Sequence, residues 1–165
     1  SCIYVSTADA TVANTITETT LIATGTGTLT LPANFLVIGK TIRIKTEGHI
    51  ANTGTPTIQF RVKLGGTVYV DTGVNTMSTI TGTRRFVFET ILTCRTTGIT
   101  GTIIGQGEFR YFTTAPVIVA NDAVSTATTN IDTTASKVID VMVDWGTANA
   151  ANTITSTNTI IEVLI

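Results

Sequence analysis

The chain has 165 residues, a formal net charge of −1, 13% charged residues and 42% hydrophobic residues. This length suits a single domain. The ten basic residues are scattered along the chain, which argues against a basic stripe that follows phosphates or an anionic membrane. No apolar run reaches the roughly 18 residues that a membrane helix needs. We therefore expect neither nucleic acid as a partner nor membrane insertion.

Threonine occupies 39 positions, so much of the polar character comes from hydroxyl groups and little from charges. Threonine is β-branched and fits a half-buried pleated surface better than a helix. Apolar and polar residues alternate with period two between glycine-rich turns, which is typical of antiparallel strands. We predict an all-β fold, an antiparallel and jelly-roll-like β-sandwich of about eight to ten strands.

Residues 19–165 are predicted to form one sandwich domain. Its first short strands surround Gly25 and Gly27, and Pro32 ends the second of them.

The clearest strand pattern is a hairpin over residues 57–70. Alternate apolar residues from Ile58 to Leu64 are expected to face the core, and Val68 and Val70 continue that face. The pair Gly65-Gly66 is predicted to form a tight turn, because both central positions of such a turn need positive φ.

Longer strands are predicted at residues 84–94, 101–112 and 137–145. Glycines at positions 105 and 107 indicate a bulge or a close approach of another backbone. The last segment, residues 153–165, carries one glutamate and otherwise only uncharged side chains. We expect it to be an edge strand that needs a cover, most simply an identical neighbour.

Asp71, Thr72 and Gly73 follow apolar residues as the catalytic Asp-Thr-Gly of an aspartic protease does. Such an enzyme needs a second carboxylate that shares a proton with the first. Val74 stands where that family keeps Ser or Thr, and Ile103 follows too soon for flap strands. We interpret the motif as a turn in which Asp71 caps the end of a strand.

Other titratable residues offer little catalytic chemistry. His49 is the single histidine, no Gly-x-Ser-x-Gly elbow accompanies it, and we predict a solvated loop residue. Cys94 follows the apolar phase of its strand and is predicted to be buried, while Cys2 lies near a terminus. A Cys2–Cys94 bridge stays open as an alternative.

Four aspartates are candidates for a catalytic carboxylate pair or for cation ligands. Asp140 and Asp144 share a strand face about 13 Å apart, farther than the carboxylates of an inverting glycosidase. Asp122 and Asp132 lack the ordered spacing of a calcium loop, although an adventitious or structural cation remains an alternative.

Four aromatic residues could stack on sugar rings, as in lectin-like sandwiches. They are Tyr69, Tyr111, Phe112 and Trp145. More often such residues lie in the core, and Trp145 follows the apolar phase of its strand, so the core is the favoured interpretation and a sugar platform is the alternative. No catalytic, cofactor-binding or metal-binding residue is assigned, and we expect a protein that is not an enzyme and needs no cofactor.

Residues 29–66, 71–73, 93–109 and 131–164, in this order, resemble a domain of tailed-phage and prophage virion proteins. The resemblance covers roughly residues 19–165. Residues 1–18 depart from it and are therefore assigned to an N-terminal connecting segment or arm. The resemblance implies a virion structural protein of the tail-fibre, minor structural or capsid decoration type, with no catalytic residues to transfer. It also implies localisation in the phage particle, assembled in the bacterial host.

The expected function is therefore oligomerisation and stabilisation of a bacteriophage particle. The expected partners are further copies of the chain, with a trimer favoured by the resemblance, and other virion proteins. The alternative is a module of the same particle that binds glycans or another receptor on the host surface.

Overall fold

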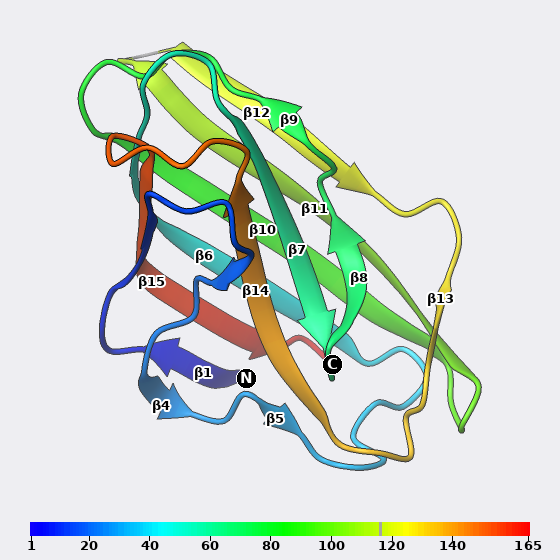
Figure 1. Cartoon of the computed structure of the whole chain (residues 1–165). Coiled ribbons are helices and arrows are strands. Elements are labelled where there is room, and N and C mark those ends of the chain that lie inside the picture. Colours follow the sequence, from blue (N-terminus) through cyan, green and yellow to red (C-terminus); the bar gives the residue numbers. More distant parts are fainter. Residues whose placement is uncertain (116) are drawn as a thin grey trace.

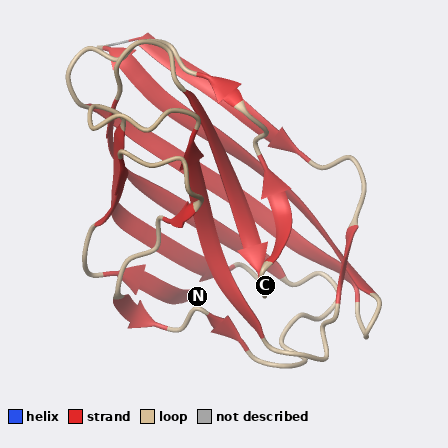
Figure 2. Ribbon diagram, viewed as in Figure 1, coloured by secondary structure: helices blue, strands red, loops and turns tan. Residues whose placement is uncertain are grey.

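A computed structural model of the chain describes residues 1–115 and 117–165. The described residues form strands, turns and loops and contain no helix (Figure 2). The strands build two antiparallel sheets that pack face to face, as Figure 1 shows. The prediction of an all-β antiparallel sandwich is confirmed.

The large sheet runs in the order β12-β11-β10-β6-β15-β1-β4, with β13 on β11 and β2 on β15. Its strands are β1 (Cys2–Ser6), β2 (Ala10–Ala13), β4 (Gly25–Gly27), β6 (Thr41–Ala51), β10 (Arg84–Thr96), β11 (Gly101–Thr114), β12 (Val117–Val124), β13 (Thr129–Ile131) and β15 (Thr153–Val163).

The small sheet runs in the order β3-β14-β7-β8, with β5 on β14 and β9 on β7. Its strands are β3 (Thr19–Thr20), β5 (Thr30–Leu31), β7 (Thr57–Leu64), β8 (Thr67–Asp71), β9 (Asn75–Thr76) and β14 (Lys137–Trp145). Nine strands in the described residues have five residues or more, and the other six are short.

The topology is jelly-roll-like in its nested pairs. β6 pairs with β15 in the large sheet, and the next strands inward along the chain, β7 and β14, pair in the small sheet. The connections from β6 to β7 and from β14 to β15 therefore cross between the sheets, as in a Greek-key sandwich. The meander β10-β11-β12 widens the large sheet on one side.

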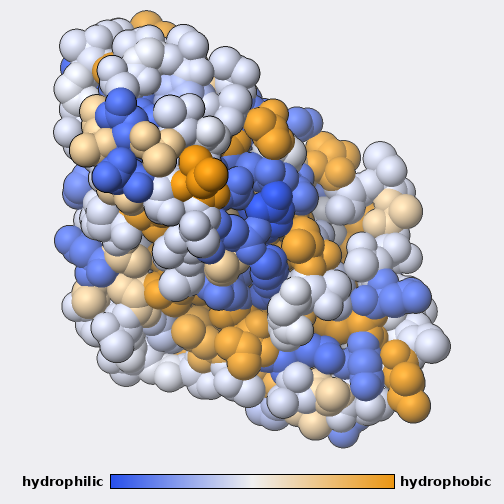
Figure 3. Space-filling model, in the orientation of Figure 1, coloured by the Kyte–Doolittle hydropathy of each residue, from blue (hydrophilic) through white to orange (hydrophobic). Residues whose placement is uncertain are grey.

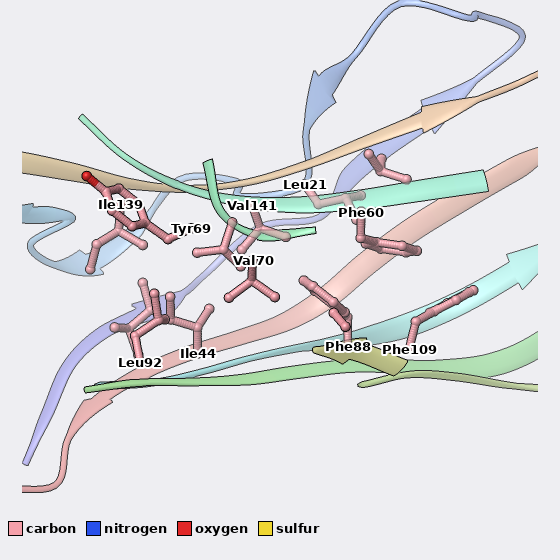
Figure 4. Close-up of a cluster of buried hydrophobic side chains, with 14 of the residues drawn as sticks. Leu21, Ile44, Phe60, Tyr69, Val70, Phe88, Leu92, Phe109, Ile139 and Val141 are labelled. Carbon is pink, nitrogen blue, oxygen red and sulfur yellow. The ribbon is translucent and has the colours of Figure 1, made fainter. Parts of the chain in front are cut away.

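The core lies between the sheets and follows the period-two pattern. Ile58, Phe60, Val62 and Leu64 of β7 are buried, as predicted. The Phe60 ring packs against Phe88 and Phe109 of the opposite sheet, with centroid distances of 4.7 and 4.4 Å (Figure 4). These contacts join the two layers at their centre.

Threonine hydroxyls pair directly across neighbouring strands. Oγ1 atoms lie 2.8 Å apart in Thr46–Thr159, Thr11–Thr155 and Thr96–Thr102, and 3.1 Å apart in Thr41–Thr93. Each pair is in register in its ladder. Cross-strand threonine pairs of this kind stabilise a sheet without the desolvation cost of charges. These eight threonines therefore serve the ladders of the fold itself.

The first eighteen residues contribute two strands to the sandwich and are not a separate arm. β1 and β2 both pair with β15, and Tyr4 and Val12 are buried in the core. The indole Nε1 of Trp145 donates to the carbonyl of Val12 at 3.1 Å. An N-terminal strand fastened in this way belongs to the domain.

The prediction that residues 153–165 form an edge strand is wrong. β15 lies inside the large sheet, with β6 on one side and β1 and β2 on the other. Its low charge is explained by this position, because an interior strand needs no charged guard. An identical neighbour is not required to cover β15.

The predicted glycine turn is confirmed, since φ is +58° at Gly65 and +82° at Gly66. Gly105 makes a close approach: a Cβ there would lie 2.7 Å from Cγ2 of Val70 and 3.3 Å from the carbonyl oxygen of Tyr69. The ladder between β10 and β11 stays in register past Gly105 and Gly107, so of the two predicted alternatives close approach holds and a bulge does not.

Candidate functional site

Asp71 ends β8 in a turn, as predicted. Its Oδ1 accepts hydrogen bonds from the backbone N–H of Gly73 at 2.8 Å and from Nε2 of Gln59 at 2.7 Å. Its Oδ2 lies 3.5 Å from Nε of Arg61. The carboxylate is thus occupied by a turn amide, a side-chain amide and a guanidinium, which are structural partners.

Arg61 is the centre of a charged cluster on the outer face of the small sheet. Its Nη1 pairs with Asp144 at 2.8 Å and also with Glu18, and Lys63 pairs with Glu18 as well. The hydrogen bond from Lys63 holds the pKa of Glu18 below its ordinary value. A hydrophilic band crosses this face in Figure 3. Each of these charges has an opposite charge beside it, which is the arrangement of a stabilising network.

The two aspartates of β14 have different partners. Asp144 pairs with Arg61, whereas Asp140 accepts a hydrogen bond from Oγ1 of Thr20 at 2.5 Å. Burial raises the pKa of Asp140 above its ordinary value. Both side chains point away from the core, as the alternation predicts.

The favoured interpretation of the four aromatic residues, a place in the core, is confirmed for three of them, which argues against the alternative of a sugar platform. Tyr69, Tyr111 and Trp145 are buried, and only Phe112 is half-exposed. The Tyr69 hydroxyl donates to the carbonyl of Asn130 at 3.0 Å, and the Tyr111 hydroxyl accepts from the backbone N–H of Ser78 at 2.8 Å. The hydroxyl of Tyr69 thus ties strand β13 to the core, and that of Tyr111 ties the segment after β9 to the core.

Tyr69 is buried because the ladder slips beside it. Val62 pairs with Val70 but Lys63 pairs with Val68, so Tyr69 is the extra residue of a bulge. A bulge re-aims the side chain that it carries. As a result Tyr69 points into the core and Val68, predicted to be buried, is only half-buried.

The remaining predicted residues lie apart from one another. His49 is exposed as predicted, but it belongs to strand β6 and not to a loop. Cys94 is buried as predicted, Cys2 is exposed, and both are free thiols. Asp132 accepts bonds from the backbone and the hydroxyl of Thr134, which lowers the pKa of Asp132. Residues 1–115 and 117–165 contain no group of three or more His, Cys, Asp or Glu placed to hold a metal.

A shallow groove of about 510 Å³ lies on the outer face of β10 and β11. Glu89 and Glu108 stand opposite each other in its ladder, and Ile91, 44% exposed, faces Gln106 beside them. Nε of Arg110 pairs with Glu108 at 2.7 Å. The groove thus offers carboxylates and a guanidinium around a small apolar floor.

The free edge of the large sheet is strand β12, next to this groove. β12 pairs only with β11, and its other side carries no strand in the described part of the chain (Figure 1). Val117, Ile118 and Val124 are 52%, 54% and 59% exposed. The strand contains one charge, Asp122, and no lysine or proline. These are the features of an edge that accepts another strand.

Sequence reasoning missed this edge, although the signal was present. The run of apolar residues over 117–120 is typical of a strand, but no local pattern shows whether a strand lies at the border of its sheet. Of the other sheet borders in the described residues, β4 has three residues, β3 has two and β8 has five. β12, with eight, is therefore the longest.

Comparison of the chain with protein-family models, with curated proteins and with solved structures gives no match. The described residues contain no helix that is long and apolar enough to cross a membrane. Functional inference therefore starts from the geometry of this chain, and the phage resemblance stays a prediction.

Proposed function

We propose that this protein is a structural component of a bacteriophage particle, a capsid decoration, head-fibre or tail-fibre domain that acts by self-association. The observation that carries the proposal is the free edge at β12, which exposes Val117, Ile118 and Val124 beside a single charge. Natural sandwiches usually guard such an edge with lysine, proline or a covering segment. A protein built to assemble has use for an open one.

The rest of the molecule supports a mechanical role. The cross-strand threonine pairs, the paired charges around Arg61 and the aromatic contacts between the sheets all stabilise the sandwich. The resemblance of residues 19–165 to virion domains points to the same role. The threefold arrangement and the other virion partners that the resemblance suggests stay predictions.

The alternative of a glycan-binding module has less support. Three of the four aromatic residues that could stack on sugars are buried and hydrogen-bonded within the core. The groove over β10 and β11 offers a glycan Ile91 and Arg110 in place of an aromatic platform.

Electron microscopy of purified particles, labelled with antibody against this chain, tests the proposal. We expect label at repeated positions on intact particles, and particles that lack the chain should lose integrity at lower temperature than complete ones. Unlabelled particles in which mass spectrometry also fails to find the chain would contradict the proposal. Labelled particles of unchanged stability that lose binding to host glycans without the chain would support the alternative.

A further inference from the structure

We infer that β12 pairs in antiparallel fashion with β12 of a second copy of this chain, so that the two large sheets become one continuous sheet across a twofold axis. The inference rests on the proposed function, because it gives the self-association a specific surface. It also specifies the register, the contacts and the symmetry.

The register is restricted by the two faces of the sheet. Along β12, Ile118, Ala120, Asp122 and Val124 lie on the outer face, opposite the outward residues of β11, whereas Ala123 is buried on the inner face. Directly opposite residues in an antiparallel pair point to the same side. A twofold axis perpendicular to the sheet must therefore pair outer residues with outer residues.

One register places Asn121 opposite Asn121 of the second copy, on the axis. Ile118 then faces Val124 of the second copy on the outer side, and Val119 faces Ala123 on the inner side. The twofold axis repeats both contacts. The most exposed apolar residues of the edge thus cover each other, at 54% and 59% exposure in the single chain.

The neighbouring register, with Ala120 on the axis, is less favourable. It would place Ile118 opposite Asp122 of the second copy and Val119 opposite Asn121. Both contacts set an apolar side chain against a polar one, so cross-strand pairing favours the register with Asn121 on the axis.

Charge complementarity supports the same register. Within one chain Asp122 stands opposite Glu108, which already pairs with Arg110, and Arg110 itself stands opposite Ala120. With Asn121 on the axis, Asp122 faces Ala120 of the second copy, and Arg110 of that copy lies one strand farther. The separation is two strand spacings, about 10 Å between backbones, which an arginine side chain spans over an alanine. The acidic pair of each copy therefore meets an arginine of the other.

A closed twofold contact of this kind gives dimers or assemblies with an even number of copies. An even number of copies differs from the trimer that the resemblance suggests, so a measured copy number distinguishes the twofold contact from the trimer. The contact also removes the longest open edge of the described chain, since each β12 then has a strand on both sides.

Sedimentation equilibrium of the full chain and of matched variants tests the contact. Ile118→Lys with Val124→Lys places like charges opposite each other across the axis, and we expect at least a tenfold weaker association. Ile118→Lys with Val124→Glu places opposite charges there and should restore association to within about threefold of the original, since cross-strand pairs of opposite charge attract. Ile99→Lys, at an exposed residue in the turn between β10 and β11, is the control and should change nothing.

Urea unfolding of each variant is the control for folding. We expect the sandwich to stay intact, because all substituted positions are exposed. If the unaltered chain associates and both double variants associate equally well, the β12 contact is wrong while self-association stands. If the unaltered chain is monomeric at about a hundred micromolar, a concentration well above the dissociation constants of specific interfaces, the contact is also wrong. The particle-labelling experiment then decides the proposed function separately.

Discussion

Phe60 of β7 lies against Phe109 of β11, with ring centroids 4.4 Å apart, and this pair connects the two sheets of the sandwich. Both side chains are fully buried. Truncation of Phe60 to Ala should therefore remove contacts with both sheets and leave a cavity. We expect a loss of about 3–5 kcal/mol in the free energy of unfolding, measured by urea denaturation. Phe60→Leu should lose clearly less, and equal losses for the two variants would show that the rings do not connect the sheets.

Gly105 is required because β8 passes close above it. Gly105→Ala should be destabilised by about 1–3 kcal/mol, since the added Cβ would lie 2.7 Å from Cγ2 of Val70. Val70→Ala in the same chain removes that methyl group, so the double variant should lose less than the sum of the single losses. Gln106→Ala, the exposed neighbour, is the control and should change stability by less than about 0.5 kcal/mol. Additive losses would contradict the close approach.

Glu18 should make the stability of the sandwich depend on pH. Lys63 lowers the pKa of Glu18 in the folded state, so the stabilisation is present above the unfolded value near 4.5 and is lost as the pH falls through the lower folded value. Glu18→Gln should cost about 1 kcal/mol at pH 7 and nothing at low pH, by urea denaturation. A cost that persists when Glu18 is protonated would show that the ion pairs are not its source.

The pH dependence expected from Asp140 is opposite to that expected from Glu18, so Asp140 serves as the matched comparison. Burial raises its pKa in the folded state, so its contribution is most favourable below the ordinary value of 3.8 and is lost as the pH rises through the folded value. Asp140→Asn keeps an oxygen for the Thr20 hydroxyl and should be at least as stable as the original chain at pH 7. A marked loss at pH 7 would indicate that the charge of Asp140 is stabilising.

Asp71→Asn tests the turn interpretation of the Asp-Thr-Gly motif. Asn keeps an acceptor for the backbone N–H of Gly73 and loses only the contact with Arg61, so the loss should be below about 1 kcal/mol. Asp71→Ala should cost more, because both acceptors are removed. Hydrolysis of peptides by the original chain that disappears in Asp71→Asn would overturn the turn interpretation.

The local part of this fold could be predicted from the sequence. The alternation over residues 57–64 and 137–145 places the buried side chains correctly, because successive side chains of a strand point to opposite faces of the sheet. The Gly65-Gly66 turn and the buried Cys94 follow from similar local reasoning. The burial of Tyr69 could not be predicted in this way, because it follows from a bulge that depends on the partner strand.

The position of each strand in its sheet could not be predicted in this way. β15 and β12 are both poor in charge, yet β15 is enclosed by β6, β1 and β2, while β12 has one neighbouring strand within residues 1–115 and 117–165. The difference arises because the two ends of the chain pair with each other. Cys2 of β1, for example, lies opposite Glu162 of β15. Local patterns carry no information on such distant partners, and for this reason low charge alone predicts an open edge at β15 where the structure has it at β12.

The β12 contact is tested most directly by a cross-link on its axis. In a chain with Cys2→Ser, which removes the exposed thiol, Asn121→Cys places one new thiol where two copies are predicted to face each other. Opposite Cβ atoms lie about 4.5–5.5 Å apart in an antiparallel pair, within reach of a disulfide or a short thiol cross-linker after small adjustment. We predict that mild oxidation gives a covalent dimer, while the same chain with Ile118→Lys and Val124→Lys stays monomeric. A chain that remains single with Asn121→Cys alone, or cross-links equally well in both backgrounds, would contradict the β12 contact.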